Sequence, residues 1–214
     1  MCVVPRLADD SKEDFMFNKT TNQKAMKTET MVLGAIMTAF VIILQLLATY
    51  TAFFGPFSTA VGLIPIVIGA IMCGPGVGAW LGFVFGLVVI MSGGAALFMP
   101  FSIFGTFATV LVKGIMCGWV SGWVYKLLAK LNNWVAVIVA SISCPIVNTG
   151  IFLLGSAVFF LDDVEAIAQI AGSPETGMAV FVGFAVANFL FELGANAVMS
   201  PVVVRLLSIK KKVK

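Results

Sequence analysis

Apolar segments long enough to cross a membrane recur along this chain, and charged residues are almost absent from their interiors. Between Thr30 and Val204, only Lys113 and Glu192 lie deep inside an apolar segment. A charge at the centre of a bilayer costs about 2.5–3.5 kcal/mol on insertion scales, so such charges are rare and usually functional. The pattern predicts a membrane protein whose functional site contains these two side chains.

The composition agrees with a membrane protein, with a mean hydropathy of +1.08 and 60% apolar residues. The alternating pattern of a membrane β-barrel is missing, so we predict an all-α fold, a six transmembrane helix bundle. The second and third segments reach only about 22 Å at 1.5 Å per residue, which leaves open whether they fully cross the membrane. The six predicted spans are 31–50, 59–72, 76–91, 104–127, 134–161 and 178–207.

Charges outside the spans predict the orientation of the bundle. Basic residues cluster before the first span, at Lys126 and Lys130 between the fourth and fifth, and from Arg205 to the end. Basic loops stay on the cytoplasmic side, so we expect both termini to be cytoplasmic in the cell membrane. We predict three parts: a mobile tail at 1–27, a membrane domain at 28–209 and a basic tail at 210–214.

The predicted outer loops differ from the inner ones in composition. The loop 162–177 is acidic, whereas the loops 51–58 and 92–103 carry no charge and are rich in Phe, Gly and Pro. The uncharged loops are either ordinary interfacial loops or walls over an outward-facing cavity. Irregular backbone at membrane depth is tolerated only where protein or a cavity surrounds it.

Several function classes lack their usual residues. The chain has no histidine and no Walker A motif, so we predict neither an enzyme nor an ATPase with a P-loop. The four cysteines lack paired spacing, so we expect buried thiols and no metal or cofactor site. The basic residues stand at membrane boundaries, where lipid head groups explain them without nucleic acid.

Small residues recur at four-residue spacing in three spans, a pattern that lets helix backbones approach closely in lipid. We expect two glycine ladders to pack inside the bundle. Ala35 and Ala39 in the first span are instead candidates for docking a partner membrane subunit. The ladders are Gly78, Gly82 and Gly86 in the third span, and Gly114, Gly118 and Gly122 in the fourth.

Polar residues on the last three spans share faces with the two charges. Helical spacing places Thr109 beside Lys113, and Asn188 and Asn196 beside Glu192. Lys113 and Glu192 each lie 13 residues from an inner anchor, Lys126 and Arg205, so we expect them at one depth, and Asn148 somewhat further outward. The predicted substrate-binding residues are Lys113, Glu192, Asn188, Asn148, Thr109 and Asn196.

Two interpretations of this polar layer are open. Lys113 and Glu192 could form an ion pair that fixes helix register. Alternatively, Lys113 binds an anionic or carbonyl group of a ligand, Glu192 binds a donor, and Asn148 and Asn188 orient the ligand. We favour the ligand site, because the layer holds more polar groups than register requires, although a ligand that opens the pair would reconcile both.

The combination of a small six-helix protein, no ATPase motif, Ala-x-x-x-Ala in the first span and apolar outer loops resembles the substrate-binding S component of energy-coupling factor (ECF) transporters. The segments 105–126 and 144–150 are similar to stretches of that family, and the resemblance covers about residues 28–209. It implies a subunit that captures a vitamin from outside and associates with a membrane coupling subunit and two cytoplasmic ATPase subunits. It also implies that Ala35 and Ala39 contact the coupling subunit.

The resemblance does not assign the vitamin. A cationic Lys113 suits a carboxylate, so pantothenate is the favoured substrate, with riboflavin and folate open. The rival interpretation is a stand-alone secondary transporter with Glu192 as its proton-coupling site.

Overall fold

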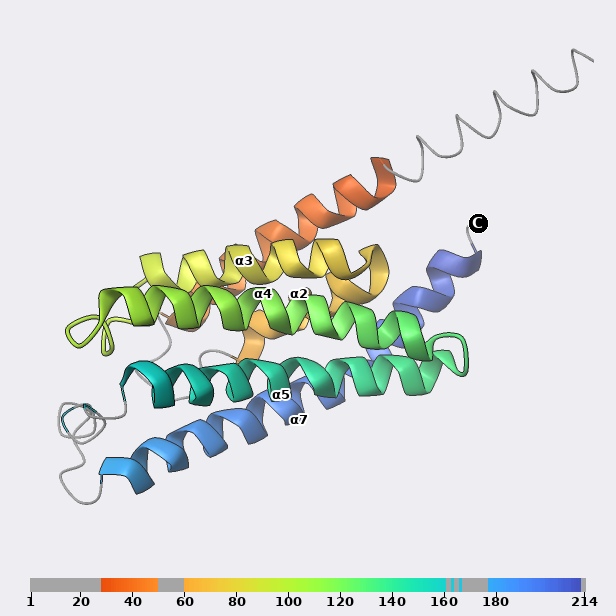
Figure 1. The fold of residues 1–214 in the computed structure, drawn as a ribbon. Helices are drawn as coiled ribbons and strands as arrows, with labels where there is room; N and C mark the ends of the chain where they lie inside the picture. The colour runs from red at the N-terminus through yellow and green to blue at the C-terminus, as the bar shows by residue number, and fades with distance from the viewer. Residues whose placement is uncertain (1–27, 50–59, 161–162, 164–165, 167–176, 213–214) are drawn as a thin grey trace, which may run out of the picture.

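The computed structural model describes residues 28–49, 60–160, 163, 166 and 177–212, and these residues form helices and turns with no strand among them. The predicted all-α fold is therefore confirmed. The first helix is described over Thr28–Thr49. The helices that follow are α2 (Ala60–Cys73), α3 (Pro75–Met91), α4 (Ile103–Leu128), α5 (Asn133–Phe159) and α7 (Gly177–Lys212) (Figure 1).

Four of these helices are long and apolar enough to cross a membrane: the first helix, α4, α5 and α7. α2 and α3 are shorter, with 14 and 17 residues. The count of six spans and the cytoplasmic location of both ends stay predictions. The segments 1–27 and 51–58, for which we predicted a tail and a loop, lie outside the described residues.

Local sequence sets the helix ends. Ser102 begins α4 by accepting a hydrogen bond from the backbone N–H of Gly105 at 3.1 Å. Asn132 begins α5 in the same way, accepting from the N–H of Trp134 at 2.9 Å. Such side chains satisfy N–H groups that have no partner in the first helical turn. Gly74, with φ of 99°, separates α2 from α3, so the predicted break between the second and third spans is confirmed.

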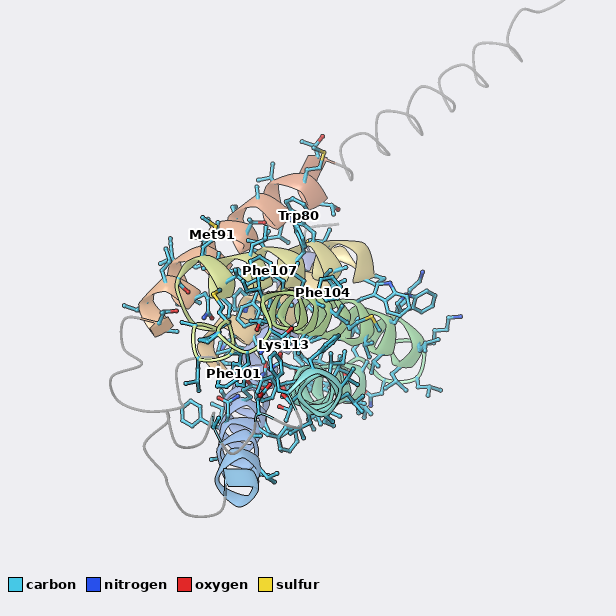
Figure 2. The ribbon with its side chains drawn as sticks, turned by 60° about the vertical axis from the view of Figure 1, so that its left-hand side comes forward. Trp80, Met91, Phe101, Phe104, Phe107 and Lys113 are labelled. Carbon is cyan, nitrogen blue, oxygen red and sulfur yellow. The ribbon has the colours of Figure 1, made fainter. Side chains whose placement is uncertain are left out.

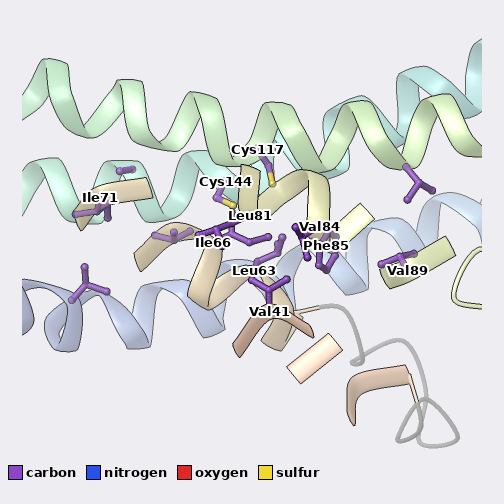
Figure 3. Packing of buried hydrophobic residues seen from close by; sticks show 14 of the residues in the cluster. Val41, Leu63, Ile66, Ile71, Leu81, Val84, Phe85, Val89, Cys117 and Cys144 are labelled. Atoms are coloured by element: carbon purple, nitrogen blue, oxygen red, sulfur yellow. The ribbon is translucent and has the colours of Figure 1, made fainter. Parts of the chain in front are cut away.

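The short α2 lies at the centre of the bundle and contacts α3, α4, α5 and α7. Leu63 and Ile66 of α2 are fully buried, and they pack against Leu81 and Phe85 of α3 (Figure 3). A helix that is apolar on all sides suits such a buried position. The prediction of buried thiols is confirmed for Cys117 and Cys144, which lie in this core as free cysteines, whereas Cys73 is partly exposed.

α3 and α4 pack backbone against backbone through the two glycine ladders. A methyl group added at Gly82 would collide with the carbonyl oxygen of Gly114, and one at Gly78 would collide with that of Gly118. Only glycine permits this approach. The prediction that the ladders pack inside the bundle is confirmed, and the ladders are each other's partners.

The outer surface of the bundle is apolar. Large side chains such as Met91 on α3 and Leu154 on α5 are strongly exposed, at 85% and 68%. Ala35 and Ala39 also lie on an exposed face of the first helix. Such a surface suits contact with lipid tails or with another membrane protein.

Candidate functional site

Glu192 is the centre of a hydrogen-bonded cluster between α5 and α7. Its side chain is fully buried. The amide of Asn148 on α5 donates to both carboxylate oxygens at 3.1 Å, and the amide of Asn188 donates to one of them at 2.8 Å. Hydrogen bonds to a charged group are stronger than neutral ones, and here they stabilise a carboxylate that burial would otherwise disfavour. The structure therefore brings together three of the predicted residues.

Asn196 belongs to the same face of α7 but serves its own helix. Its amide donates to the backbone carbonyl of Glu192 at 2.9 Å, and Ser200 donates in turn to the carbonyl of Asn196 at 2.9 Å. Both side chains are buried. Asn196 thus lies one turn from Glu192 on α7 and bonds the backbone of that residue rather than its carboxylate.

Lys113 has a different partner from the one that the ion-pair interpretation expects. Its Nζ atom lies over the ring of Phe152 on α5, 5.1 Å from the ring centroid. Figure 2 shows Lys113 near the middle of the bundle, whereas Met91 lies at its edge. Within the described ranges, no carboxylate oxygen lies within the 4.0 Å of a salt bridge from this ammonium group. The direct Lys113–Glu192 pair is therefore not formed in this structure.

The two charges nevertheless lie close in depth. Along α5, Lys113 meets Phe152 and Glu192 meets Asn148, and these two positions are one helical turn apart, about 6 Å at 1.5 Å per residue. The expectation that Asn148 lies further outward than Glu192 is wrong, because the two side chains bond directly. The count started from Lys130, whereas α5 begins only at Asn133.

Thr109 lies at the contact between α4 and α5, where a methyl group added at Gly155 would collide with its side chain. Its hydroxyl is buried and has no hydrogen-bond partner among the described residues, and the same holds for the side-chain carbonyl of Asn148 and the hydroxyl of Ser156. A buried polar atom without a partner costs about 1–3 kcal/mol. These groups can therefore accept or donate bonds to a polar ligand.

The turn segment after α3 reaches this region through an aromatic contact. Phe98 meets Phe152 edge to face, with 5.7 Å between ring centroids, and packs on Phe160 in a tilted arrangement at 5.5 Å. The same segment is tied to the first helix, since the hydroxyls of Thr49 and Ser92 lie 3.1 Å apart. The uncharged loop 92–103 thus folds back onto α5 beside the two charges.

Sequence reasoning missed Phe98 and Phe152. Phe152 stands four residues after Asn148, so helical spacing placed it on the polar face of α5. The chain has 19 phenylalanines, and residue type alone does not distinguish this one. Its role depends on which side chain of α4 lies opposite, and that is set by packing.

An open apolar groove of about 390 Å³ lies elsewhere, between α2 and α7, and contains none of the predicted site residues. Its lining is Ile64, Leu190, Phe191, Gly194, Ala195, Val198 and Met199. This lining offers no group that would select a charged ligand.

Comparison with known proteins identifies the family of this chain. Residues 29–204 match the model of the ECF transporter, substrate-specific component, which is most of the 214-residue chain. The chain belongs to this family. The searches of curated proteins and of solved structures found no match.

This S component is thus a membrane-embedded, substrate-specific subunit of a transporter, and its family is not an enzyme family. S components bind a small-molecule substrate and work with membrane and ATPase modules. The match covers the first helix with Ala35 and Ala39, and it covers α4, α5 and the part of α7 that holds Glu192.

Proposed function

We propose that this S component captures a small anionic vitamin, with pantothenate as the first candidate, for an ATP-driven ECF importer. The observation that carries the proposal is the separation of the buried Glu192 carboxylate from the partly buried Lys113 ammonium. Lys113 makes a cation–π contact with an aromatic ring, and Glu192 accepts hydrogen bonds from two amides. Neither charge neutralises the other directly, so the site offers both a cation and an acceptor to one ligand.

The residues match the groups of such a molecule. Lys113 would bind the carboxylate, since a partly buried ammonium gains from an anionic partner. Glu192 would accept from a hydroxyl group, while Asn148 and Asn188 hold its carboxylate in place. Pantothenate carries a carboxylate, an amide and two hydroxyls. The amide N–H suits the side-chain carbonyl of Asn148, which has no partner among the described residues.

Energy for import would come from other subunits. The chain has no Walker A motif. In our proposal, a membrane coupling subunit and two cytoplasmic ATPases supply it. The exposed face with Ala35 and Ala39 supports a docking role for the first helix, because small residues let another helix backbone approach.

Binding to the purified protein tests the site. We expect Lys113→Met to weaken the binding of radiolabelled pantothenate roughly 10- to 150-fold, the equivalent of about 1.5–3 kcal/mol for one charged hydrogen bond. Lys126→Met is the matched control, because Lys126 makes a similar contact with Trp123 at the far end of α4, 5.3 Å from the ring centroid. Equal affinity in wild type and Lys113→Met would remove Lys113 from the site.

Uptake by cells separates the proposal from a secondary transporter that uses Glu192 for proton coupling. We expect uptake to survive a collapsed proton gradient and to stop when the ATPase subunits are deleted. The opposite pattern would favour the proton-coupled carrier. Mass spectrometry of the small molecule that co-purifies would identify the substrate directly.

A further inference from the structure

We propose that Phe152 is a positioning residue that holds the Lys113 ammonium away from the Glu192 carboxylate and so keeps this charge available to an anionic ligand. The inference rests on the proposed function, because it assigns an anion to Lys113. It concerns a side chain that neither the sequence pattern nor the family match singles out.

Two partners, Glu192 and Phe152, compete for the ammonium group of Lys113. Glu192 is the acidic side chain bound to Asn148, one helical turn from Phe152 along α5. Opposite charges attract strongly where water is scarce, so a lysine and a glutamate on neighbouring helices, at levels that differ by one helical turn, would be expected to pair. The structure shows the ammonium on the face of Phe152 instead, within the range of a cation–π contact.

The ring of Phe152 is held in place by aromatic neighbours. Phe152 lies on α5, one turn beyond Asn148, and Phe98 meets it edge to face at 5.7 Å. Phe98 is itself packed on Phe160, so the ring is held from the side of the turn segment. Edge-to-face contacts of this kind favour one ring orientation. Phe152 therefore presents its face to Lys113.

Glu192 likewise has partners other than Lys113. Two amides occupy its carboxylate oxygens, so the carboxylate does not need the ammonium to remain buried. A ring face is a weaker partner than a carboxylate. An anion that enters the site can displace the ring from Lys113 more easily than it could open a buried ion pair.

The ligand-dependent test compares acid and alcohol forms of one molecule. In Phe152→Leu, Lys113 should pair with Glu192, and pantothenate should bind at least about tenfold more weakly, while the uncharged pantothenol changes little. Phe152→Tyr keeps the ring and should keep the preference for the acid. Trp123→Leu removes the lysine–ring contact at Lys126 and should change the binding of neither ligand. Equal losses for both ligands in Phe152→Leu would overturn the proposal.

The ligand-independent test measures the coupling of the two charges in the purified protein. The melting temperatures of Lys113→Met, Glu192→Gln and the double variant give an interaction term. We expect this term to grow by at least about 2 °C when the same set is made in the Phe152→Leu background. A term that is unchanged or smaller would overturn the proposal.

The two tests fail separately. If the wild type binds neither pantothenate nor pantothenol but the interaction term grows as expected, the substrate assignment is wrong and the role of Phe152 stands. If Phe152→Leu does not yield folded protein, Phe152→Met, which keeps the volume without the ring, is measured in its place and judged by the same two outcomes.

Discussion

At the scale of single residues, the carboxylate of Glu192 and the amide of Asn148 form one unit. A buried carboxylate is tolerable only when donors replace its water, and Asn148 reaches both oxygens. The stability lost when the Asn148 amide is removed therefore depends on whether the buried Glu192 carboxylate is still present. This mutual dependence of Asn148 and Glu192 distinguishes the cluster from polar side chains that contribute to stability independently.

Asn148→Leu should lower stability by about 1.5–3 kcal/mol, because the carboxylate loses a donor while it stays buried. For a chain of this size the melting temperature should fall by roughly 4–10 °C. In a Glu192→Leu background, the same change should cost much less, since no charge remains to be solvated. Thermal melts of the four proteins in one detergent measure both effects. Equal falls in the two backgrounds would show that the residues act independently.

At the scale of helices, the sequence predicted most of the architecture. The apolar segments are local signals, and the observed helices begin and end close to the predicted spans. α7 is the exception, since it continues to Lys212 rather than ending near 207. Lysine is a good helix former, so the basic residues at its end extend it.

What lies opposite each helix face could not be predicted. Four-residue spacing placed Lys113 on a polar face, but not over Phe152, because that contact needs the rotation and relative depth of α4 and α5. The same holds for the glycine ladders, which were expected to pack without a named partner. Their facing arrangement depends on the antiparallel alignment of α3 and α4, and sequence spacing within each helix carries no information about that alignment.

The close approach of α3 and α4 gives a prediction at this scale. Gly114→Ala should cost about 1–3 kcal/mol, because its methyl group would press on the backbone of Gly82. Gly150→Ala on α5 is the matched control. A methyl group there meets no atom within 4 Å, and the variant should be neutral or slightly stabilising. Size-exclusion profiles and melting temperatures compare the two, and similar values would contradict the packing argument.

At the scale of the whole molecule, the bundle separates two surfaces. Lys113 and Glu192 lie among α4, α5 and α7, whereas Ala35 and Ala39 lie on an exposed face of the first helix. Substitutions at the proposed binding site and at the proposed docking face can therefore be tested one at a time. The contact between Thr49 and Ser92 connects the first helix with the turn segment that carries Phe98.

Ala35→Trp should leave vitamin binding by the purified protein unchanged and abolish uptake by cells. A large ring on this face would keep another helix from approaching, while the site lies elsewhere. Ile138→Trp, on an exposed face of α5, is the control and should preserve both activities. Wild-type uptake by the Ala35→Trp variant would remove the docking role from this face.

The unequal lengths of the helices have a consequence for the surrounding lipid. α3 has 17 residues and exposes Trp80 and Met91, so its apolar side spans about 25 Å, less than the hydrocarbon core of about 30 Å. α4 and α5, with 26 and 27 residues, are long enough to span it with room to tilt. If α3 crosses the membrane as predicted, the lipids beside it must thin, or the bundle must tilt toward that side. We expect the stability of the protein to depend on the acyl-chain length of the surrounding lipid. Shorter chains should be favoured beside α3.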